Sequence, residues 1–240
     1  LSDPQMVNEL KTQLTNASSP APSVETILHA ILPFKYVDHT HSDAVVTVTN
    51  TLEGEGRIRE IYGERVVIIP YVMPGFDLAK DVARIFSEQS TDKTEGMILM
   101  NHGIFSFGDS AKESYDRMIS LVNEAENYLM SKNAWDIEKP EANFEPKNIR
   151  NQIAGLRQKI SLAIGKPVLM HLTNSLLGCK FCNKEDVKKI ATKGPLTPDH
   201  VIRTKRIPMI GRDINKYSEE YASYFNKNEI NAKARKTMLD

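Results

Sequence analysis

Residues 97–109 read Met-Ile-Leu-Met-Asn-His-Gly-Ile-Phe-Ser-Phe-Gly-Asp, and this stretch decides the fold. Its two apolar runs, 97–100 and 104–107, have the length and composition of buried strands. Only Asn-His-Gly separates them, so the two runs are predicted to form an antiparallel hairpin. Gly103 is expected to allow the sharp backbone turn, which leaves His102 at the end of a buried strand.

The flanking sequence supplies further elements for the same core. Residues 65–70 form another continuous apolar run of strand length, and residues 35–40 are predicted to form a short strand. Apolar side chains recur at helical spacing over 77–88 and 110–130. Ser23 and Ser42 are typical N-cap residues and predict helices over 23–32 and 42–49. Together these elements predict an α/β fold with helices packed on a central sheet.

A break in this pattern marks a domain boundary at residues 132–147, which contain two prolines and no apolar periodicity. This segment is predicted to be a linker between a core over 1–136 and a smaller C-terminal α/β extension over 137–240. The extension is predicted to contain helices over 149–164, 185–192 and 213–228. A strand is predicted over 168–172, with His171 as a structural residue among apolar neighbours.

Composition excludes several classes of partner. The 240 residues contain 31 Lys plus Arg and 31 Asp plus Glu, so no net field attracts nucleic acid or an anionic membrane. No apolar run approaches the about 20 residues that span a bilayer, so we expect a cytoplasmic protein without a membrane partner. The two cysteines, Cys179 and Cys182, lack a second Cys or His pair nearby, which favours chance thiols over a zinc or redox site.

Histidines at predicted strand ends form the strongest chemical signal. His39 and His41 point to the same face of a strand, at a spacing that can close on one metal ion, although two surface imidazoles would give the same pattern. His102 supplies a third imidazole, the number that catalytic zinc commonly takes while keeping one position open. Glu25, near the start of a helix leading to His39, is either a ligand or base, or a carboxylate that stabilises the helix end.

Three segments then carry a family resemblance. They are Pro22-Ser-Val-Glu-Thr-Ile-Leu-His29, Val37-Asp-His-Thr-His-Ser-Asp-Ala44 and Leu99-Met-Asn-His-Gly103. In this order they resemble the class II aldolase/adducin family, over about residues 20–130. The resemblance implies a class II aldolase-like fold with a mostly antiparallel central sheet, and a homotetramer with sites at subunit interfaces. It also implies that Glu25 is catalytic and that His39, His41 and His102 bind zinc or another divalent metal.

Residues 71–79, 102–109 and 194–206 narrow the resemblance to the aldolase part of bifunctional rhamnulose-phosphate aldolase/short-chain dehydrogenases. This implies cleavage of L-rhamnulose 1-phosphate to dihydroxyacetone phosphate and lactaldehyde, with a downstream NAD-dependent domain in the longer protein. These 240 residues contain no Gly-x-Gly-x-x-Gly fingerprint, so the dehydrogenase part is not expected within them. The family's amino-terminal strand and glycine-rich phosphate loop also have no counterpart, so we expect the chain to start after them.

Ser23 and Arg203 are the candidate substrate-binding residues. Arg203, Lys205 and Arg206 would alternate along a predicted strand, where they either hold a phosphate or form a salt-bridged surface. The expected function is a zinc-dependent aldolase acting on a small phosphorylated sugar, a ketose 1-phosphate. A sugar-phosphate epimerase or dehydratase on the same fold, and a non-catalytic adducin-like module, remain alternatives. The intact Glu25 and three histidines argue against the module.

Residues beside the candidate ligands have two interpretations each. Asp38 and Asn101 flank the histidines and would either orient them through hydrogen bonds or form turns. His29 follows Glu25 by one helical turn, where it either helps to position the site or is a partly buried histidine with its own partner.

Overall fold

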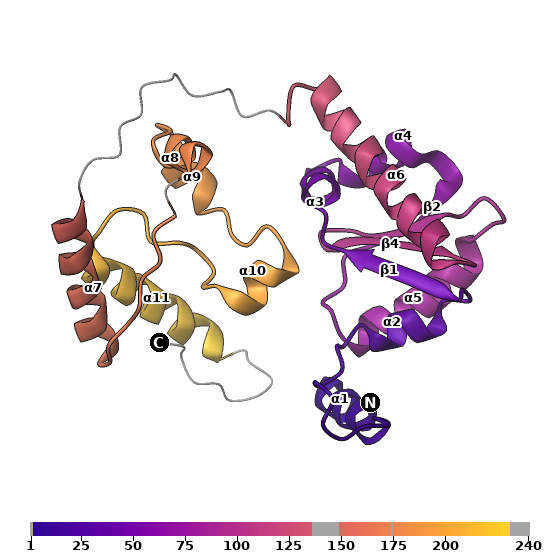
Figure 1. The fold of residues 1–240 in the computed structure, drawn as a ribbon, viewed down its shortest axis with the longest axis horizontal. Coiled ribbons are helices and arrows are strands. Elements are labelled where there is room, and N and C mark those ends of the chain that lie inside the picture. The colour runs from indigo at the N-terminus through magenta and orange to yellow at the C-terminus, as the bar shows by residue number, and fades with distance from the viewer. Residues whose placement is uncertain (1, 136–148, 174, 231–240) are drawn as a thin grey trace. The chain divides into compact units, whose positions relative to one another are not determined.

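A four-stranded sheet forms the centre of the first part of the chain in the computed structural model, which describes residues 2–135, 149–173 and 175–230 (Figure 1). The strands follow the order β1-β4-β3-β2. β1–β4 and β3–β4 are antiparallel, and β2–β3 is parallel, which confirms the mostly antiparallel sheet. Their bounds are β1 Tyr36–Thr40, β2 Val66–Ile69, β3 Gly96–Leu99 and β4 Gly103–Gly108.

Helices cover both faces of this sheet (Figure 1). On one face lie α2 (Thr26–Ile31) and α5 (Phe76–Gln89), and on the other lie α3 (Asp43–Thr49), α4 (Gly54–Tyr62) and α6 (Ala111–Ser131). α1 (Asp3–Thr12) precedes them, and the short 3-10 helix η1 (Gly63–Arg65) leads into β2. The α/β class predicted from the sequence is therefore confirmed, with the sheet between two layers of helices.

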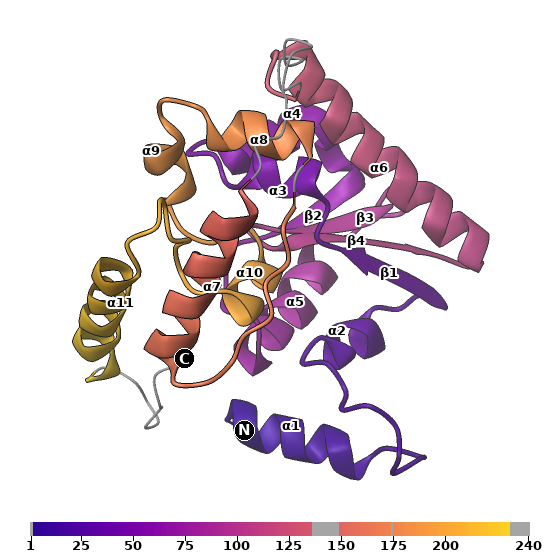
Figure 2. The same ribbon diagram turned by 60° about the vertical axis from the view of Figure 1, so that its left-hand side comes forward.

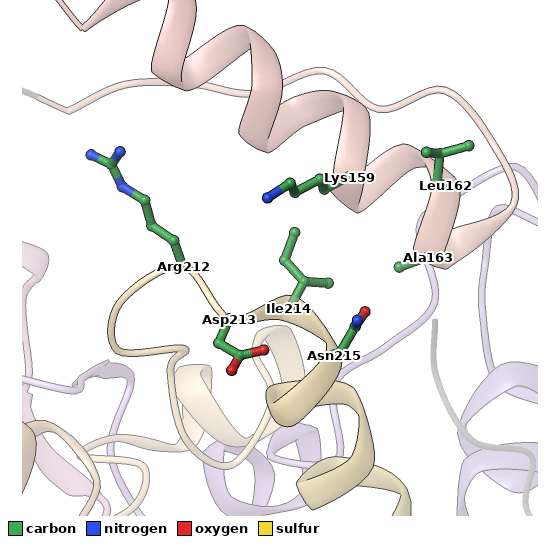
Figure 3. A pocket seen from close by; sticks show the side chains of 7 residues that line it. All are labelled: Lys159, Leu162, Ala163, Arg212, Asp213, Ile214 and Asn215. Atoms are coloured by element: carbon green, nitrogen blue, oxygen red, sulfur yellow. The ribbon is translucent and has the colours of Figure 1, made fainter.

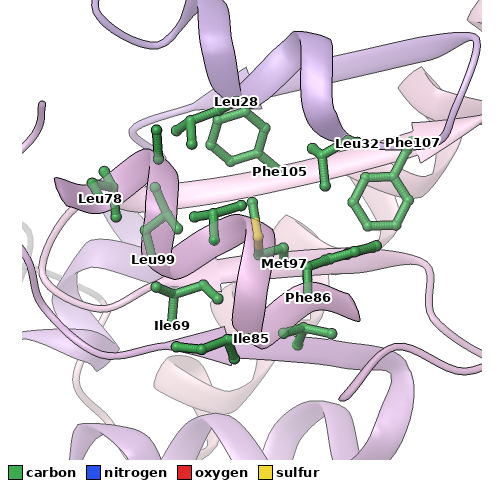
Figure 4. Packing of buried hydrophobic residues seen from close by; sticks show 13 residues of the cluster. Leu28, Leu32, Ile69, Leu78, Ile85, Phe86, Met97, Leu99, Phe105 and Phe107 are labelled. Atoms are coloured by element: carbon green, nitrogen blue, oxygen red, sulfur yellow. The ribbon is translucent and has the colours of Figure 1, made fainter. Parts of the chain in front are cut away.

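Each face of the sheet has its own hydrophobic core, because successive side chains of a strand point to opposite faces. Val67 and Ile69 of β2 enter one core, whereas Val66 and Ile68 enter the other. The first, the Phe105 cluster, is shown in Figure 4 and consists of Leu28, Leu32, Val67, Ile69, Leu78, Ala79, Val82, Ile85, Phe86, Met97, Leu99, Phe105 and Phe107. Burial on both faces explains why β2 and β3 read as continuous apolar runs.

The helix α4 was not predicted from the sequence pattern. α4 (Gly54–Tyr62) has the sequence Gly-Glu-Gly-Arg-Ile-Arg-Glu-Ile-Tyr, with two glycines and four charged residues, which gives it a low helix propensity. The structure stabilises it through tertiary packing, since Ile58 and Tyr62 are almost fully buried against the second core. The Tyr62 hydroxyl also donates a hydrogen bond to the carbonyl oxygen of Leu121, at 2.7 Å.

The chain divides into two compact units. Unit 1 comprises Leu1–Asp136 together with Leu196–Arg203, so that α10 (Pro198–Arg203) belongs to it. Unit 2 comprises Ile137–Pro195 and Thr204–Asp240. Most of the predicted linker, 136–147, lies outside the described residues.

The described part of unit 2 contains helices and no strand. α7 (Arg150–Ile164) and α11 (Ile214–Glu229) lie side by side in both ribbon views (Figure 1 and Figure 2), and α8 (Leu176–Cys182) and α9 (Val187–Ala191) are short. The strand predicted over 168–172 is wrong: these residues have no regular structure, and Leu169 is 97% exposed. No described strand of unit 2 is present to pair with them, so an apolar run alone did not suffice. His171 is exposed rather than buried among apolar neighbours.

Among the residues that the structure describes, no helix has both the length and the apolar character required to cross a membrane.

Candidate metal centre

Two turns bring three histidines to one end of the sheet. His39 lies in β1 and His41 follows directly after it, while His102 lies in the turn between β3 and β4. The antiparallel register places His39 opposite Phe105 of β4, and their rings stack with centroids 4.1 Å apart. The predicted β3–β4 hairpin is confirmed, and the hairpin together with the β1–β4 pairing determines where the imidazoles meet.

The backbone that presents His102 differs from the expectation in one respect. Asn101, not Gly103, adopts the left-handed conformation, with φ of 57°. Its amide donates hydrogen bonds to the carbonyl oxygen of Thr49 (3.2 Å) and to Oδ1 of Asn50 (2.8 Å). An asparagine tolerates this conformation because its short polar side chain can bond locally. Asn101 therefore forms the turn and ties it to the end of α3.

Gly103 is required for space rather than for conformational freedom. A Cβ atom at this position would lie 2.6 Å from the carbonyl oxygen of Thr40 and 3.0 Å from ring atoms of both His39 and His41. No side chain larger than hydrogen fits there without displacing them. The glycine thus allows the two imidazoles to pack directly against the backbone of β4.

The three imidazoles and Glu25 converge. The ring centroids are 4.9 Å apart for His39–His41, 5.4 Å for His39–His102 and 4.9 Å for His41–His102. Oε1 of Glu25 lies 2.8 Å from Nε2 of His102 and 3.5 Å from Nε2 of His39. One ligand atom from each of the four residues lies within 4.8 Å of the others, an arrangement that could hold a metal ion. We call these four residues the Glu-His group.

Hydrogen bonds at the far side of two rings leave their inner nitrogens available. Nδ1 of His39 donates to the carbonyl oxygen of Ile104 at 3.0 Å, and Nδ1 of His41 donates to Oδ2 of Asp199 at 2.8 Å. Nε2 of each ring is buried and has no hydrogen-bond partner among the described residues. A neutral imidazole that donates through Nδ1 carries its lone pair on Nε2, as a metal ligand requires. The residues present therefore fit a metal ion.

Glu25 occupies a different helix position from the one predicted. α2 begins at Thr26 with Glu25 as its N-cap residue, whereas the sequence pattern predicts Ser23 for that position. Oγ of Ser23 instead accepts a hydrogen bond from the Glu25 backbone N–H at 3.1 Å. The chain forms a turn before the helix, in which the Thr26 N–H donates to the Ser23 carbonyl oxygen at 3.1 Å, and the Glu25 carboxylate lies 2.8 Å from His102. Ser23 fixes the backbone of Glu25 in this arrangement.

The Glu25 carboxylate is strongly acidic in this environment. Its hydrogen bond with His102 holds its pKa well below the ordinary range, and the nearby His39 imidazole, with Nε2 3.5 Å from Oε1, acts in the same direction, although partial burial acts in the opposite direction. Glu25 is therefore ionised at neutral pH and presents a negatively charged oxygen to the centre of the group. An anionic oxygen beside three imidazoles suits a divalent cation or a proton-transfer role.

Two residues that are near the candidate ligands in sequence do not belong to the Glu-His group. Asp38 points to the opposite face of β1 and accepts a hydrogen bond from the buried Ser114 hydroxyl at 2.6 Å, so it orients none of the histidines. The His29 ring contacts Phe105, with centroids 5.4 Å apart, and is outside the Glu-His group.

Sequence reasoning missed Asp199. It lies in α10, 158 residues after His41, and its side chain is 47% exposed. Hydrogen bonds from His41 and then from Arg203 lower the pKa of its carboxyl group. The strand predicted around Arg203 is wrong, because Arg203 ends α10 and its Nε lies 3.2 Å from Oδ1 of Asp199. The sequence Thr-Pro-Asp-His at 197–200 contains no pattern that predicts a contact with His41.

Unit 2 contains a hollow with a volume of about 740 Å³ (Figure 3). It lies between α7 and the start of α11 and is lined by Lys159, Leu162, Ala163, Arg212, Asp213, Ile214 and Asn215. None of the Glu-His group lines it. Cys179 and Cys182 of α8 have reduced thiol groups. The chemically distinctive residues of the described chain are therefore those of unit 1.

Two protein-family models match this chain, and the first covers the part that contains the Glu-His group. Residues 3–129 match the family model of the class II aldolase and adducin N-terminal domain, and residues 147–240 match that of the class II aldolase second domain. The chain belongs to the class II aldolase and adducin family. The Glu-His group lies entirely within the N-terminal match of this family, and Asp199 lies within the second.

One curated relative of this class II aldolase family member has a moderate sequence identity. An uncharacterized oxidoreductase of Bacillus subtilis (strain 168), YuxG, is 31% identical over 255 residues, covering 95% of this chain and 36% of that protein. The chain thus spans about a third of the length of that curated relative.

Two solved structures are also similar in part. The N-terminal class II aldolase domain of a conserved protein from Thermoplasma acidophilum is 43% identical, with a TM-score of 0.48, covering 54% of this chain and 58% of that one. A sugar-phosphate aldolase from Thermotoga maritima is 19% identical, with a TM-score of 0.40, covering 50% of this chain and 58% of that one.

Proposed function

We propose that this chain is a zinc-dependent aldolase that cleaves a ketose 1-phosphate. The observation that carries the proposal is the Glu-His group, in which buried Nε2 atoms of His39 and His41 have no hydrogen-bond partner among the described residues. Leaving polar atoms buried and unpaired costs free energy, about 1–3 kcal/mol each. A metal ligand role would remove that cost, and membership of the class II aldolase and adducin family supports it.

His39, His41 and His102 would hold the ion, with Glu25 beside them. A bound zinc ion would supply Lewis acidity to the hydroxyl and carbonyl oxygens of the ketose. Cleavage removes the proton of the C4 hydroxyl, breaks the C3–C4 bond and leaves the electron pair on C3, which then takes up a proton. The Glu25 carboxylate is the group proposed to move that proton, because it is the carboxylate of the Glu-His group and is only partly exposed, at 20%.

The substrate proposal rests on the sequence resemblance. We propose a rhamnulose 1-phosphate-like ketose, giving dihydroxyacetone phosphate and lactaldehyde, with Ser23 and Arg203 as substrate-binding residues. The relative named as an oxidoreductase extends well beyond the matched part, which supports a longer protein that also contains a short-chain dehydrogenase. A homotetramer is proposed on the same resemblance. Replacement of Arg203 by Ala should raise KM for the phosphorylated ketose; an unchanged KM would remove Arg203 from the substrate site.

The test combines metal content with activity on a panel of ketose 1-phosphates. Wild type should contain about one zinc per chain and release dihydroxyacetone phosphate, detected by a coupled NADH assay. His39→Ala should lose both the zinc and the activity. Glu25→Gln should lower kcat by about 10²–10⁴-fold, the usual contribution of a general acid or base. His171→Ala is the matched control, because His171 is exposed and outside the group, and it should behave as wild type.

Other results would select another function. A metal-loaded protein that converts a sugar phosphate to its epimer, or dehydrates it, without cleavage would replace the aldolase proposal by one of these activities. Wild type that takes up no divalent metal would contradict the enzyme proposal and favour a non-catalytic adducin-like module.

A further inference from the structure

The segment Leu196–Arg203 belongs to unit 1, contacts His41 directly and is linked to the His102 turn through Asn50. At its start, the carbonyl oxygen of Leu196 accepts a hydrogen bond from Nδ2 of Asn50 at 2.9 Å. Asn50 also accepts from Asn101, the residue before His102. Thr197 is 7% exposed, so this residue of the segment is packed, whereas Leu196, Val201 and Ile202 are exposed. Three residues after Leu196, Asp199 accepts the hydrogen bond from His41.

We infer that Asp199 is a positioning residue of the metal centre, which fixes His41 with Nδ1 protonated and Nε2 directed at the ion, and that metal occupancy is thereby coupled to docking of the segment Leu196–Arg203. The inference rests on the proposed metal site. It adds a residue outside the Glu-His group, and it predicts a binding property that the group alone would not have.

The geometry of His41 carries the argument. His39 obtains its Nδ1 acceptor from the backbone, at Ile104, so that partner persists whatever the neighbouring side chains are. His41 has a side-chain acceptor instead, and among the described residues Asp199 is the partner found for its Nδ1. A carboxylate behind a ligating imidazole fixes the ring orientation and increases its basicity as a ligand. Of the two histidines with an Nδ1 partner, His41 is therefore the one whose alignment can be removed by one substitution.

Asp199 is itself held in place. Its second oxygen, Oδ1, lies 3.2 Å from Nε of Arg203, one turn later in α10. The two oxygens thus have separate partners, which limits rotation of the carboxylate away from His41. Exposure of this pair to solvent makes it a weak source of stability, so the expected effect is on metal affinity and ring orientation rather than on folding.

The effects of metal binding and of docking of the segment on each other are reciprocal. If docking of the segment Leu196–Arg203 increases metal affinity, the metal must stabilise docking of the segment by the same factor. Zinc should therefore slow hydrogen exchange of the backbone amides in this segment. The effect requires the Asp199 side chain and should disappear when it is truncated.

The experiment measures zinc affinity of the full chain by competition with a chromophoric chelator. Asp199→Ala should bind zinc about 10–100-fold more weakly than wild type, the usual loss when such a partner is removed. Asp199→Asn keeps an acceptor oxygen and should lie between the two. Asp81→Ala is the matched control, since Asp81 pairs with Arg84 on α5 in a similar exposed ion pair without touching a histidine, and it should bind as wild type does.

Two further measurements distinguish a change in the orientation of the His41 ring from a general loss of structure around the site. Nitrogen-15 NMR of the zinc-free protein should show His41 protonated at Nδ1 in wild type and Asp199→Asn, and a mixture of tautomers in Asp199→Ala. Hydrogen exchange over 196–203 should slow on zinc addition in wild type but not in Asp199→Ala.

The outcomes are distinct. If Asp199→Ala matches wild type in zinc affinity and in the His41 tautomer, the positioning role is overturned while the metal centre of the proposed function stands. If wild type itself binds no zinc, both the proposed function and this inference are overturned.

Discussion

Substitution of Gly103 by Ala tests whether the histidines depend on the space beneath them. The added Cβ would lie 2.6 Å from the carbonyl oxygen of Thr40, so one of the two strands must move by about 0.8 Å to reach an ordinary contact of 3.4 Å. The obstacle is backbone, which cannot rotate away as a flexible side chain would. Gly103 is not among the residues with positive φ, so backbone strain adds nothing to this cost.

The expected effect has two parts. Overpacking should lower the free energy of unfolding by about 1–3 kcal/mol. The same Cβ would lie 3.0 Å from ring atoms of His39 and His41, and both rings must shift by a few tenths of an ångström. Because zinc sites tolerate only about 0.2 Å in ligand distance, zinc affinity should fall by at least about tenfold.

Unfolding in urea can be followed through Trp135, the single tryptophan, which packs against the second core of unit 1. Zinc affinity is measured in parallel on the folded protein. Gly56→Ala is the matched control, since nothing lies within 4 Å of its Cβ position in α4 and the substitution should be neutral or stabilising by about 0.4–1 kcal/mol. A Gly103→Ala protein with the stability and zinc affinity of wild type would refute the argument that space at this position decides the geometry of the site.

Three further predictions concern the core and the metal. Phe105→Ala should lower the free energy of unfolding by about 3–5 kcal/mol in urea denaturation, because Phe105 is fully buried and supports the His39 ring; a loss below about 1 kcal/mol would contradict this. Tyr62→Phe should cost about 1 kcal/mol by the same assay, since the buried hydroxyl loses its bond to Leu121, and an equal or higher stability would show that this bond contributes nothing. Removal of zinc by a chelator should lower the unfolding free energy by about 2.7 kcal/mol relative to protein at a zinc concentration 100 times Kd, and His39→Ala should show no such difference.

Sequence by itself determined the elements whose signal is local. The apolar runs of β2, β3 and β4 are continuous because both faces of the sheet are buried, and α6 is long enough for its apolar spacing to be unambiguous. Alternation of side chains along an extended chain is sufficient to place His39 and His41 on one face. The resemblance to class II aldolases and adducins connected these histidines with Glu25 and His102.

Only the tertiary structure decided which distant side chains meet. Glu25 and His102 are 77 residues apart and come within 2.8 Å because strand pairing and the packing of α2 bring their turns together. The Asp199 contact with His41 spans 158 residues and leaves no periodic trace in the sequence. The helical state of α4 and the absence of a strand at 168–172 have the same physical reason: burial against neighbours, which propensity and apolar spacing do not record, selects between local conformations of similar free energy.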